Sequence, residues 1–287
     1  MSWRHRLSAR EQQLLEESEA AILLPPPERK GLARWTEQRL EQLGDKVPEV
    51  IRQQLTQAIS SALETMQRGS NWLVSRDSVH ERLRWRLGDF PGPAALLQVP
   101  CWVLDEVAQD YARRATTGLT IEGAAAGAAG LVGLAADIPI LYCTLFKTIQ
   151  EIALCYGFPV KPPQERYHLF QALDLGHSLH HRERGRIAEQ GFLMQELIRQ
   201  GTRVEVLEAV AAQSYRGSGT STQALARNLR LARQLALDLL ERKLLQGLVI
   251  VGSAIGAAAN YTLARDVGNA AFHLYRRRFL MEVALRR

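Results

Sequence analysis

Apolar residues recur along most of the chain at the three-to-four residue spacing of one helix face. Runs of β-branched residues are short, so signals for β-strands are nearly absent. The pattern predicts an all-α fold, a multi-helix bundle with two Gly/Ala-rich, close-packed central segments. Helices outside those segments are expected over residues 8–23, 28–44, 48–68, 101–116 and 222–245. Ser8 is a candidate N-cap of the first, and three prolines from Pro25 end it.

Proline and glycine divide the chain into two unlike halves. Every proline lies before residue 164, so the second half permits long helices. Residues 88–100, "GDFPGPAALLQVP", are a Pro/Gly-rich joint that a helix should follow. Residues 215–223, "YRGSGTSTQ", are the clearest break in the second half.

Two segments rich in glycine and alanine, 121–146 and 244–264, are almost free of charge. A glycine inside a helix costs about 0.8–1 kcal/mol relative to alanine. Several glycines in one helix therefore need a compensating gain, usually the close approach of another helix backbone. The glycines at this small-residue spacing are Gly123, Gly127, Gly130, Gly133, Gly252 and Gly256.

Asp137 and Pro139 interrupt the first of these segments. An aspartate caps helix N-termini well and proline is tolerated in the first turn. We therefore expect a helix over 120–135, a tight turn at Asp137, and a second helix over 138–156 that ends at Gly157. A charged aspartate at the centre of a bilayer costs on the order of 2.5–3.5 kcal/mol, so a true transmembrane span is the least favoured interpretation.

Two interpretations of these segments are equally favoured. In the first, both are close-packed helices of a water-soluble core. In the second, they form an apolar surface that docks on a membrane or holds a lipid. A basic tail follows the second segment and would attract anionic headgroups, by about 1 kcal/mol per near-surface charge; it consists of Arg276, Arg277, Arg278, Arg286 and Arg287. A solvated helix end explains the same tail equally well.

Charge and cysteine content indicate which partners and which cellular compartment to expect. The formal net charge is +6 and the pI is near 9.5, which favours anionic partners. The arginines alternate with glutamate and leucine rather than with exposed aromatics, so nucleic acid is not an expected partner. The three cysteines lie in apolar surroundings without a CxxC pair, and the N-terminus is too charged for a signal peptide. We expect a cytoplasmic protein.

The sequence resembles the EcsC family of bacterial proteins. The resemblance rests on "GLAADIPILYCTLFKTIQEIALCYGFPV", 133–160, and on "VGSAIGAAANYTLARDVGNAAFHLYRRRFL", 251–280. It covers roughly residues 70–287, which predicts an N-terminal helical extension over 1–69 and an EcsC-like helical domain over 70–287. The resemblance implies an all-helical bacterial protein, often encoded near membrane transport functions, with no established catalytic activity.

Polar residues close to the apolar segments are candidates for a site. Asp137, Glu151, Asn260 and Asp266 match polar positions of the two family motifs. Asp266, Asn269 and His273 follow one another at i, i+3 and i+7, which places them on one helix face. Converging carboxylates could serve hydrolysis. The plainer interpretation is that Asp137 caps a helix and that Glu151 pairs with Lys147.

The sequence gives little support for a zinc site, a catalytic nucleophile or a nucleotide-binding site. His177 and His181 are four residues apart and could bind zinc, but arginines surround them and a solvated histidine cluster is favoured. Nucleophile and nucleotide-binding motifs such as GxSxG and GxxxxGK[ST] are missing. We therefore expect no catalytic residue, metal or cofactor.

The favoured function is peripheral membrane association with lipid binding, at the inner face of the cell membrane. The expected partner is an anionic membrane lipid or a membrane protein. The alternatives are a soluble regulatory or scaffold partner of a membrane transport system and, least favoured, a carboxylate-dependent hydrolase. The sequence does not indicate an oligomeric state.

Overall fold

A computed structural model describes residues 3–24, 53, 56–57, 59–61, 74–89, 92–128, 130–160, 163–178, 181–201 and 252–287. For 121–128, 130–139, 163–164, 166 and 252–259 it describes the backbone alone. Throughout these ranges the chain forms helices and turns, without a β-strand, which confirms the predicted all-α class. The helices predicted over 28–44 and 222–245, and most of 48–68, lie outside the described residues.

Helix α1, Ala9–Leu23, begins where its sequence predicts. The Ser8 hydroxyl accepts a hydrogen bond from the backbone N–H of Glu11, and the Glu11 carboxylate accepts one from the backbone N–H of Ser8. This reciprocal capping box satisfies two donors that a helix start leaves unpaired. The short 3₁₀-helix η1, Arg4–Arg6, precedes it.

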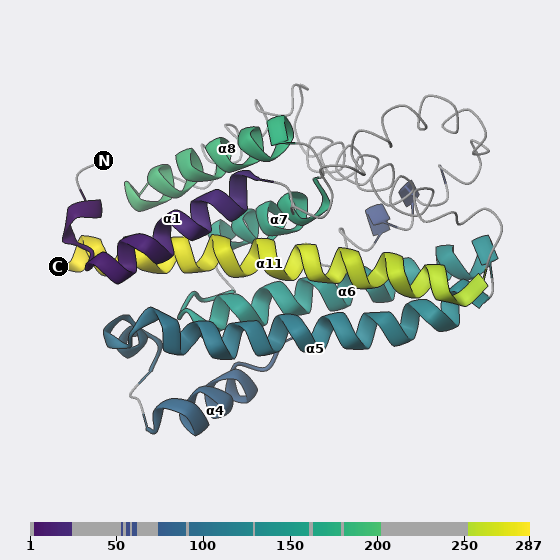
Figure 1. The fold of residues 1–287 in the computed structure, drawn as a ribbon, viewed down its shortest axis with the longest axis horizontal. Coiled ribbons are helices and arrows are strands. Elements are labelled where there is room, and N and C mark those ends of the chain that lie inside the picture. The colour runs from purple at the N-terminus through teal and green to yellow at the C-terminus, as the bar shows by residue number, and fades with distance from the viewer. Residues whose placement is uncertain are drawn as a thin grey trace.

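Three long helices form the centre of the molecule. Helices α5 (Cys101–Ala128), α6 (Gly130–Cys155) and α11 (Gly252–Arg286) lie side by side, and α11 makes its most extensive contacts with α5. The end of α5 and the beginnings of α6 and α11 lie at the same end of this layer, on the right in Figure 1. The described parts of the two Gly/Ala-rich segments therefore lie at the same end of the fold.

The predicted turn at Asp137 is wrong. Helix α5 continues to Ala128, α6 begins at Gly130, and both Asp137 and Pro139 lie inside α6. A proline in a helix interior costs about 3 kcal/mol. Packing of α6 along α5 and α11 outweighs this local preference. The predicted end at Gly157 is confirmed, since α6 ends at Cys155 and Gly157 has φ +80°.

The remaining helices surround α11 and the hairpin of α5 and α6. Helices α1 and α7 (Pro163–His177) pack on α11, and α8 (His181–Arg199) packs on α1 and α7. Helix α4 (Arg76–Leu87) packs against α6 and α5, and the 3₁₀-helix η4 (Pro93–Gln98) precedes α5. The C-terminal half of α11 is thus surrounded by other helices, and most of its residues are buried.

Glycines allow two of these contacts. A Cβ atom at Gly176 of α7 would lie 2.4 Å from the Cα atom of Val267, so the backbones of α7 and α11 touch there. A Cβ atom at Gly268 would lie 3.1 Å from the Cβ atom of Ala112 on α5. Close helix approach at glycine therefore occurs at two positions outside the predicted set.

Candidate functional site

The candidate polar residues do not share one environment. Asp137 lies inside α6, in the part described by its backbone alone. Glu151 is half-buried, pairs with Lys147 at 3.9 Å, and has its other charged neighbours on α4 and α5. Burial raises the pKa of the Glu151 carboxyl, and the neighbouring cations oppose this.

The candidates on α11 are likewise divided between the interior and the surface. Asn260 and Asp266 are buried, and an Oδ1 atom of Asp266 lies 3.5 Å from Nε of Arg265. Asn269 is exposed, although it is one turn from Asp266. Burial, followed by the charges of Arg276 and Arg184, lowers the pKa of His273 to about 3. Glu151 and Asp266, the two candidate carboxylates whose side chains are described, therefore have different charged neighbours.

The histidine pair is also divided. His177 is fully buried and forms a 3.2 Å hydrogen bond with the Tyr142 hydroxyl, whereas His181 is exposed. The expected solvated histidine cluster is therefore wrong for His177. Among the described residues, no group of three or more His, Cys, Asp or Glu side chains could hold a metal ion.

Three consecutive arginines of α11 form the centre of a buried charge network. Arg276, Arg277 and Arg278 are each at most 7% exposed. Successive residues of an α-helix are rotated by about 100°, so the three side chains leave α11 in three directions. Each direction leads to a different set of neighbouring helices, and each arginine finds an acidic partner there.

Arg276 joins α11 to α1 and α5. Its NH1 atom lies 3.3 Å from Oδ2 of Asp105, and its Nε atom donates a 2.7 Å hydrogen bond to the Ser18 hydroxyl. The Tyr156 hydroxyl donates a 2.6 Å hydrogen bond to Oδ1 of Asp105, so both oxygens of this buried carboxylate have a partner. Cys101 completes the cluster at 3.6 Å from the same oxygen.

Arg277 joins α11 to α1 and α8. Its Nε atom donates to Glu19 at 3.1 Å, and its NH1 atom donates to Gln195 at 3.0 Å. Its guanidinium carbon lies 3.6 Å from the centre of the Phe192 ring, which is a cation–π contact of a buried guanidinium.

Arg278 joins α11 to α7. Its two terminal nitrogens donate to the two carboxylate oxygens of Glu165 at 2.6 and 3.0 Å, a bidentate pair. The Tyr275 hydroxyl donates to the same carboxylate at 2.7 Å, and the Phe158 ring lies 4.1 Å from the guanidinium.

These contacts correct one prediction made from the sequence. The run Arg276, Arg277 and Arg278 was expected to face anionic headgroups, but all three side chains are buried and paired inside the protein. The run lies on the most deeply packed part of α11, so it cannot form a headgroup-binding surface in this structure. Its role is to hold α1, α5, α7 and α8 around α11.

Arg184 of α8 is a fourth buried arginine that the sequence pattern did not single out. It donates to the carbonyl oxygens of Ala21 and Ile22 at the end of α1, at 2.9 and 3.0 Å. It also donates to the carbonyls of Leu175 and Ser178 at the end of α7, at 2.5 and 3.3 Å. One side chain thus satisfies the last carbonyls of two helices.

Two acidic groups of the network, the Cys101 thiol and the Asp105 carboxyl, have raised pKa values. Burial raises the pKa of the Cys101 thiol well above its usual value, and the nearby Asp105 carboxylate raises it further, so the thiol stays protonated. Burial also raises the pKa of Asp105, against the hydrogen bonds from Tyr156 and Arg276. The arrangement is suited to cross-linking helices.

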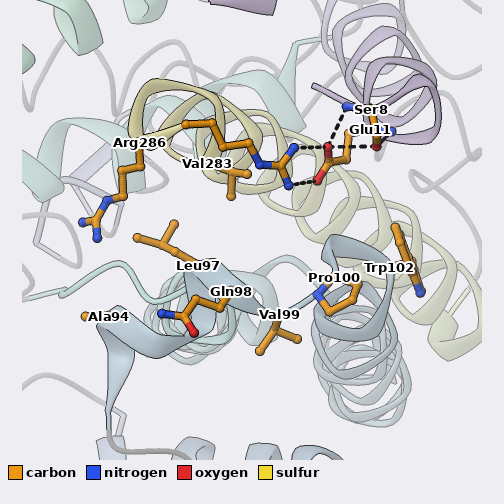
Figure 2. Close-up of a pocket in the computed structure, with 11 residues that line it drawn as sticks. Ser8, Glu11, Ala94, Leu97, Gln98, Val99, Pro100, Trp102, Val283 and Arg286 are labelled. Atoms are coloured by element: carbon orange, nitrogen blue, oxygen red, sulfur yellow. Dashed lines mark hydrogen bonds and ion pairs between the residues drawn. The ribbon is translucent and has the colours of Figure 1, made fainter. Parts of the chain in front are cut away.

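A separate cavity of about 520 Å³ lies where the two ends of the described chain meet. Figure 2 shows Arg286 on one side and Ser8 and Glu11 on the other, with Val283 and Leu97 between them. The cavity contains none of the candidate polar residues or glycines predicted from the sequence, but it contains Arg286 and Arg287 of the basic tail. Its apolar lining consists of Ala94, Leu97, Val99, Pro100, Trp102 and Val283.

The Gly/Ala-rich segments, which the sequence predicts to contact a membrane, lie at the end of the molecule opposite this cavity. Within the described ranges, no helix combines the length and the apolarity that a membrane span requires. The first described side chains beyond the charge-poor helix ends include two exposed large residues, Ile140 of α6 and Tyr261 of α11.

Fold and sites together define an all-α bundle whose central C-terminal helix is tied to its neighbours by buried arginines. The chain belongs to the EcsC protein family, which matches residues 11–280 and confirms the resemblance seen in the sequence. Two proteins of Bacillus subtilis (strain 168) are similar along most of their length. The uncharacterized protein YdbA is 25% identical over 248 residues, 84% of this chain and 83% of YdbA. Protein EcsC is 24% identical over 252 residues, 88% of each chain. No solved structure matches the chain significantly.

Proposed function

We propose that this EcsC-family protein associates peripherally with membranes and binds lipid through the charge-poor end of its three-helix layer. The observation that carries the proposal is the convergence of three helix ends with almost no charge. Between Glu122 and Lys147 the only formally charged residue is Asp137, and α11 carries no charge before Arg265. The end of α5 and the beginnings of α6 and α11 lie together in Figure 1.

Side chains next to this end support the same orientation. Ile140 is 53% exposed and Tyr261 is 43% exposed, which is unusual for large apolar residues in a protein with a well-buried core. The Arg265 guanidinium lies 6.0 Å from the centre of the Tyr261 ring. An amphipathic aromatic ring beside a cation is typical of residues at the level of lipid headgroups.

The proposed contact is shallow. Burial of apolar surface supplies about 25 cal/mol per Å². The formal net charge of +6 favours anionic lipid. The buried run from Arg276 to Arg278 takes no part in it.

Co-sedimentation with vesicles tests the proposal. The protein is mixed with vesicles of phosphatidylcholine alone or with added phosphatidylglycerol, at moderate salt. We expect binding to the anionic vesicles, and roughly tenfold weaker binding for Ile140→Asp, because the change removes apolar burial and adds a repelling charge. The matched control is Leu193→Asp on α8, because Leu193 is equally exposed at 53% but lies on a different helix. The proposal fails if the wild type stays in the supernatant or if both variants bind as it does.

A second candidate function, a scaffold that binds a protein of a membrane transport system, is favoured by Trp85. This side chain is 87% exposed on α4, between Arg84 and Arg86. Exposed tryptophan and arginine are enriched in protein interfaces. The two functions are separable, since Trp85→Ala should leave vesicle binding unchanged if Trp85 serves a protein contact.

A further inference from the structure

The cavity at the other end of the molecule has the size of a small-molecule site. Its volume of about 520 Å³ falls within the roughly 300–1,000 Å³ typical of pockets that hold one ligand. Four parts of the chain surround it: the start of α1, η4 with the residues that follow it, the first turn of α5, and the end of α11. A cavity of this size accommodates one molecule and is too small to accept a bilayer surface.

Most of the lining is apolar and comes from the joint before α5 and from α11. Leu97, Val99 and Trp102 are half-buried and Val283 is buried, so a ligand would cover apolar surface that water now reaches. The Arg10 guanidinium lies 3.9 Å from the centre of the Trp102 ring, which covers one face of the indole and holds it in place. The lining therefore suits an apolar chain.

The polar groups of the cavity leave one positive charge unmatched. The Glu11 carboxylate accepts hydrogen bonds from the backbone N–H and hydroxyl of Ser8, and from both terminal nitrogens of Arg287 at 2.7 and 2.9 Å. Glu11 and Arg287 thus neutralise each other. Arg286 is exposed and forms no ion pair with any residue in the part of the chain that the structure describes. It is the charge available to a ligand, with the Gln98 amide as a further donor at the rim.

We infer that this cavity binds a free monoanionic amphiphile, such as a long-chain carboxylate, with its carboxylate at Arg286 and its apolar chain against Leu97, Val99 and Trp102. Arginine recognises carboxylates through two parallel hydrogen bonds, and the apolar lining supplies the burial. The site is independent of the proposed membrane contact, because the two lie at opposite ends of the three-helix layer (Figure 1).

Fluorescence titration of the purified full chain tests the inference. The probe is a dansyl-labelled undecanoic acid below its micellar concentration, without vesicles, and it is displaced by laurate or by the neutral dodecanol. We expect saturable probe binding, displacement by laurate, and roughly tenfold weaker probe binding to Arg286→Gln, from the loss of one charge-assisted contact. Dodecanol should compete equally well in the wild type and in Arg286→Gln.

Three further variants make the result decisive. Ala94→Trp fills the cavity from an exposed position of η4, so it should abolish binding while the circular dichroism spectrum and the midpoint of thermal unfolding stay unchanged. Arg113→Gln removes an exposed arginine of α5 outside the cavity and should bind as the wild type does. Ile140→Asp should also bind normally, which separates this site from the membrane contact. The inference is overturned if the wild type does not bind the probe, or if Arg286→Gln and Ala94→Trp bind it unchanged.

Discussion

Arg278 and Glu165, which are 113 residues apart in the sequence, form a buried, bidentate ion pair between α11 and α7. Both side chains are less than 10% exposed. Taking two charges out of water is costly, and the mutual attraction offsets this only when hydrogen bonds complete the site. Here Tyr275 donates to the same carboxylate and Phe158 covers the guanidinium. The pair fixes where α7 packs on α11.

Removal of one partner should therefore be strongly destabilising. Glu165→Gln leaves the charge of Arg278 buried without its hydrogen-bonded carboxylate, and we expect a loss of about 3–5 kcal/mol in the free energy of unfolding, measured by urea denaturation. The control is Glu196→Gln, which removes an ion pair with Arg199 on the surface of α8 and should change stability little. Equal effects of the two variants would contradict a buried electrostatic link.

The close approach of α7 and α11 at Gly176 gives a second prediction. Gly176→Ala places a methyl group 2.4 Å from the Cα atom of Val267, so one backbone must move. Overpacking of this kind costs about 1–3 kcal/mol. Gly185→Ala on α8 is the matched control, because a Cβ atom there meets nothing within 4 Å. The control should stabilise the protein slightly through helix propensity, by about 0.5–1 kcal/mol. Thermal and urea unfolding of both variants measure the two opposite signs.

Stability should depend on pH through His273. Its folded-state pKa is about 3, against an ordinary value of 6.5, so the unfolded chain takes up a proton that the folded protein refuses. The stability is fully present above about pH 6.5 and falls by about 1.4 kcal/mol per pH unit below it. Between about pH 7 and about pH 5 we expect a loss of about 2 kcal/mol from this residue.

The variant His273→Gln isolates that contribution. Glutamine stays neutral and can still accept the hydrogen bond that Nδ1 of His273 shares with Arg276. Asp105 and Glu151 have raised pKa values and act in the opposite direction on acidification, but they do so in both proteins. Urea denaturation at a series of pH values should therefore show a shallower acid-side slope for His273→Gln than for the wild type. Parallel curves would contradict the assignment.

The fold could be predicted from the sequence wherever the signal was local. The capping box of α1, the start of α5 after Pro100 and the end of α6 before Gly157 each depend on residues within one turn of the boundary. The junction of α5 and α6 was misplaced because Asp137 and Pro139 give a strong local turn signal that packing along the whole of α6 overrides.

The buried charge network could not be predicted in the same way. The partners of Arg276 and Arg278 are 171 and 113 residues away, and nothing in a helical pattern specifies which distant carboxylate an arginine meets. One signal was present. Asp105 lies on the apolar face that Cys101 and Ala108 define, and a lone carboxylate in that position indicates a buried partner.

The cysteines provide a last prediction, on chemical reactivity. Cys101 and Cys155 are at most 1% exposed, and burial raises the pKa of both thiols, so neither forms a thiolate accessible to a reagent. Cys143 is only half-buried. With a disulfide reagent such as DTNB at mildly alkaline pH, one thiol of the native protein should react before the other two. Cys143→Ser should remove this first phase of the reaction. In denaturant the remaining two thiols of the variant should react fully. A native Cys143→Ser protein that still reacts at the wild-type rate would mean that the helices holding Cys101 open far more readily than a network of buried ion pairs allows.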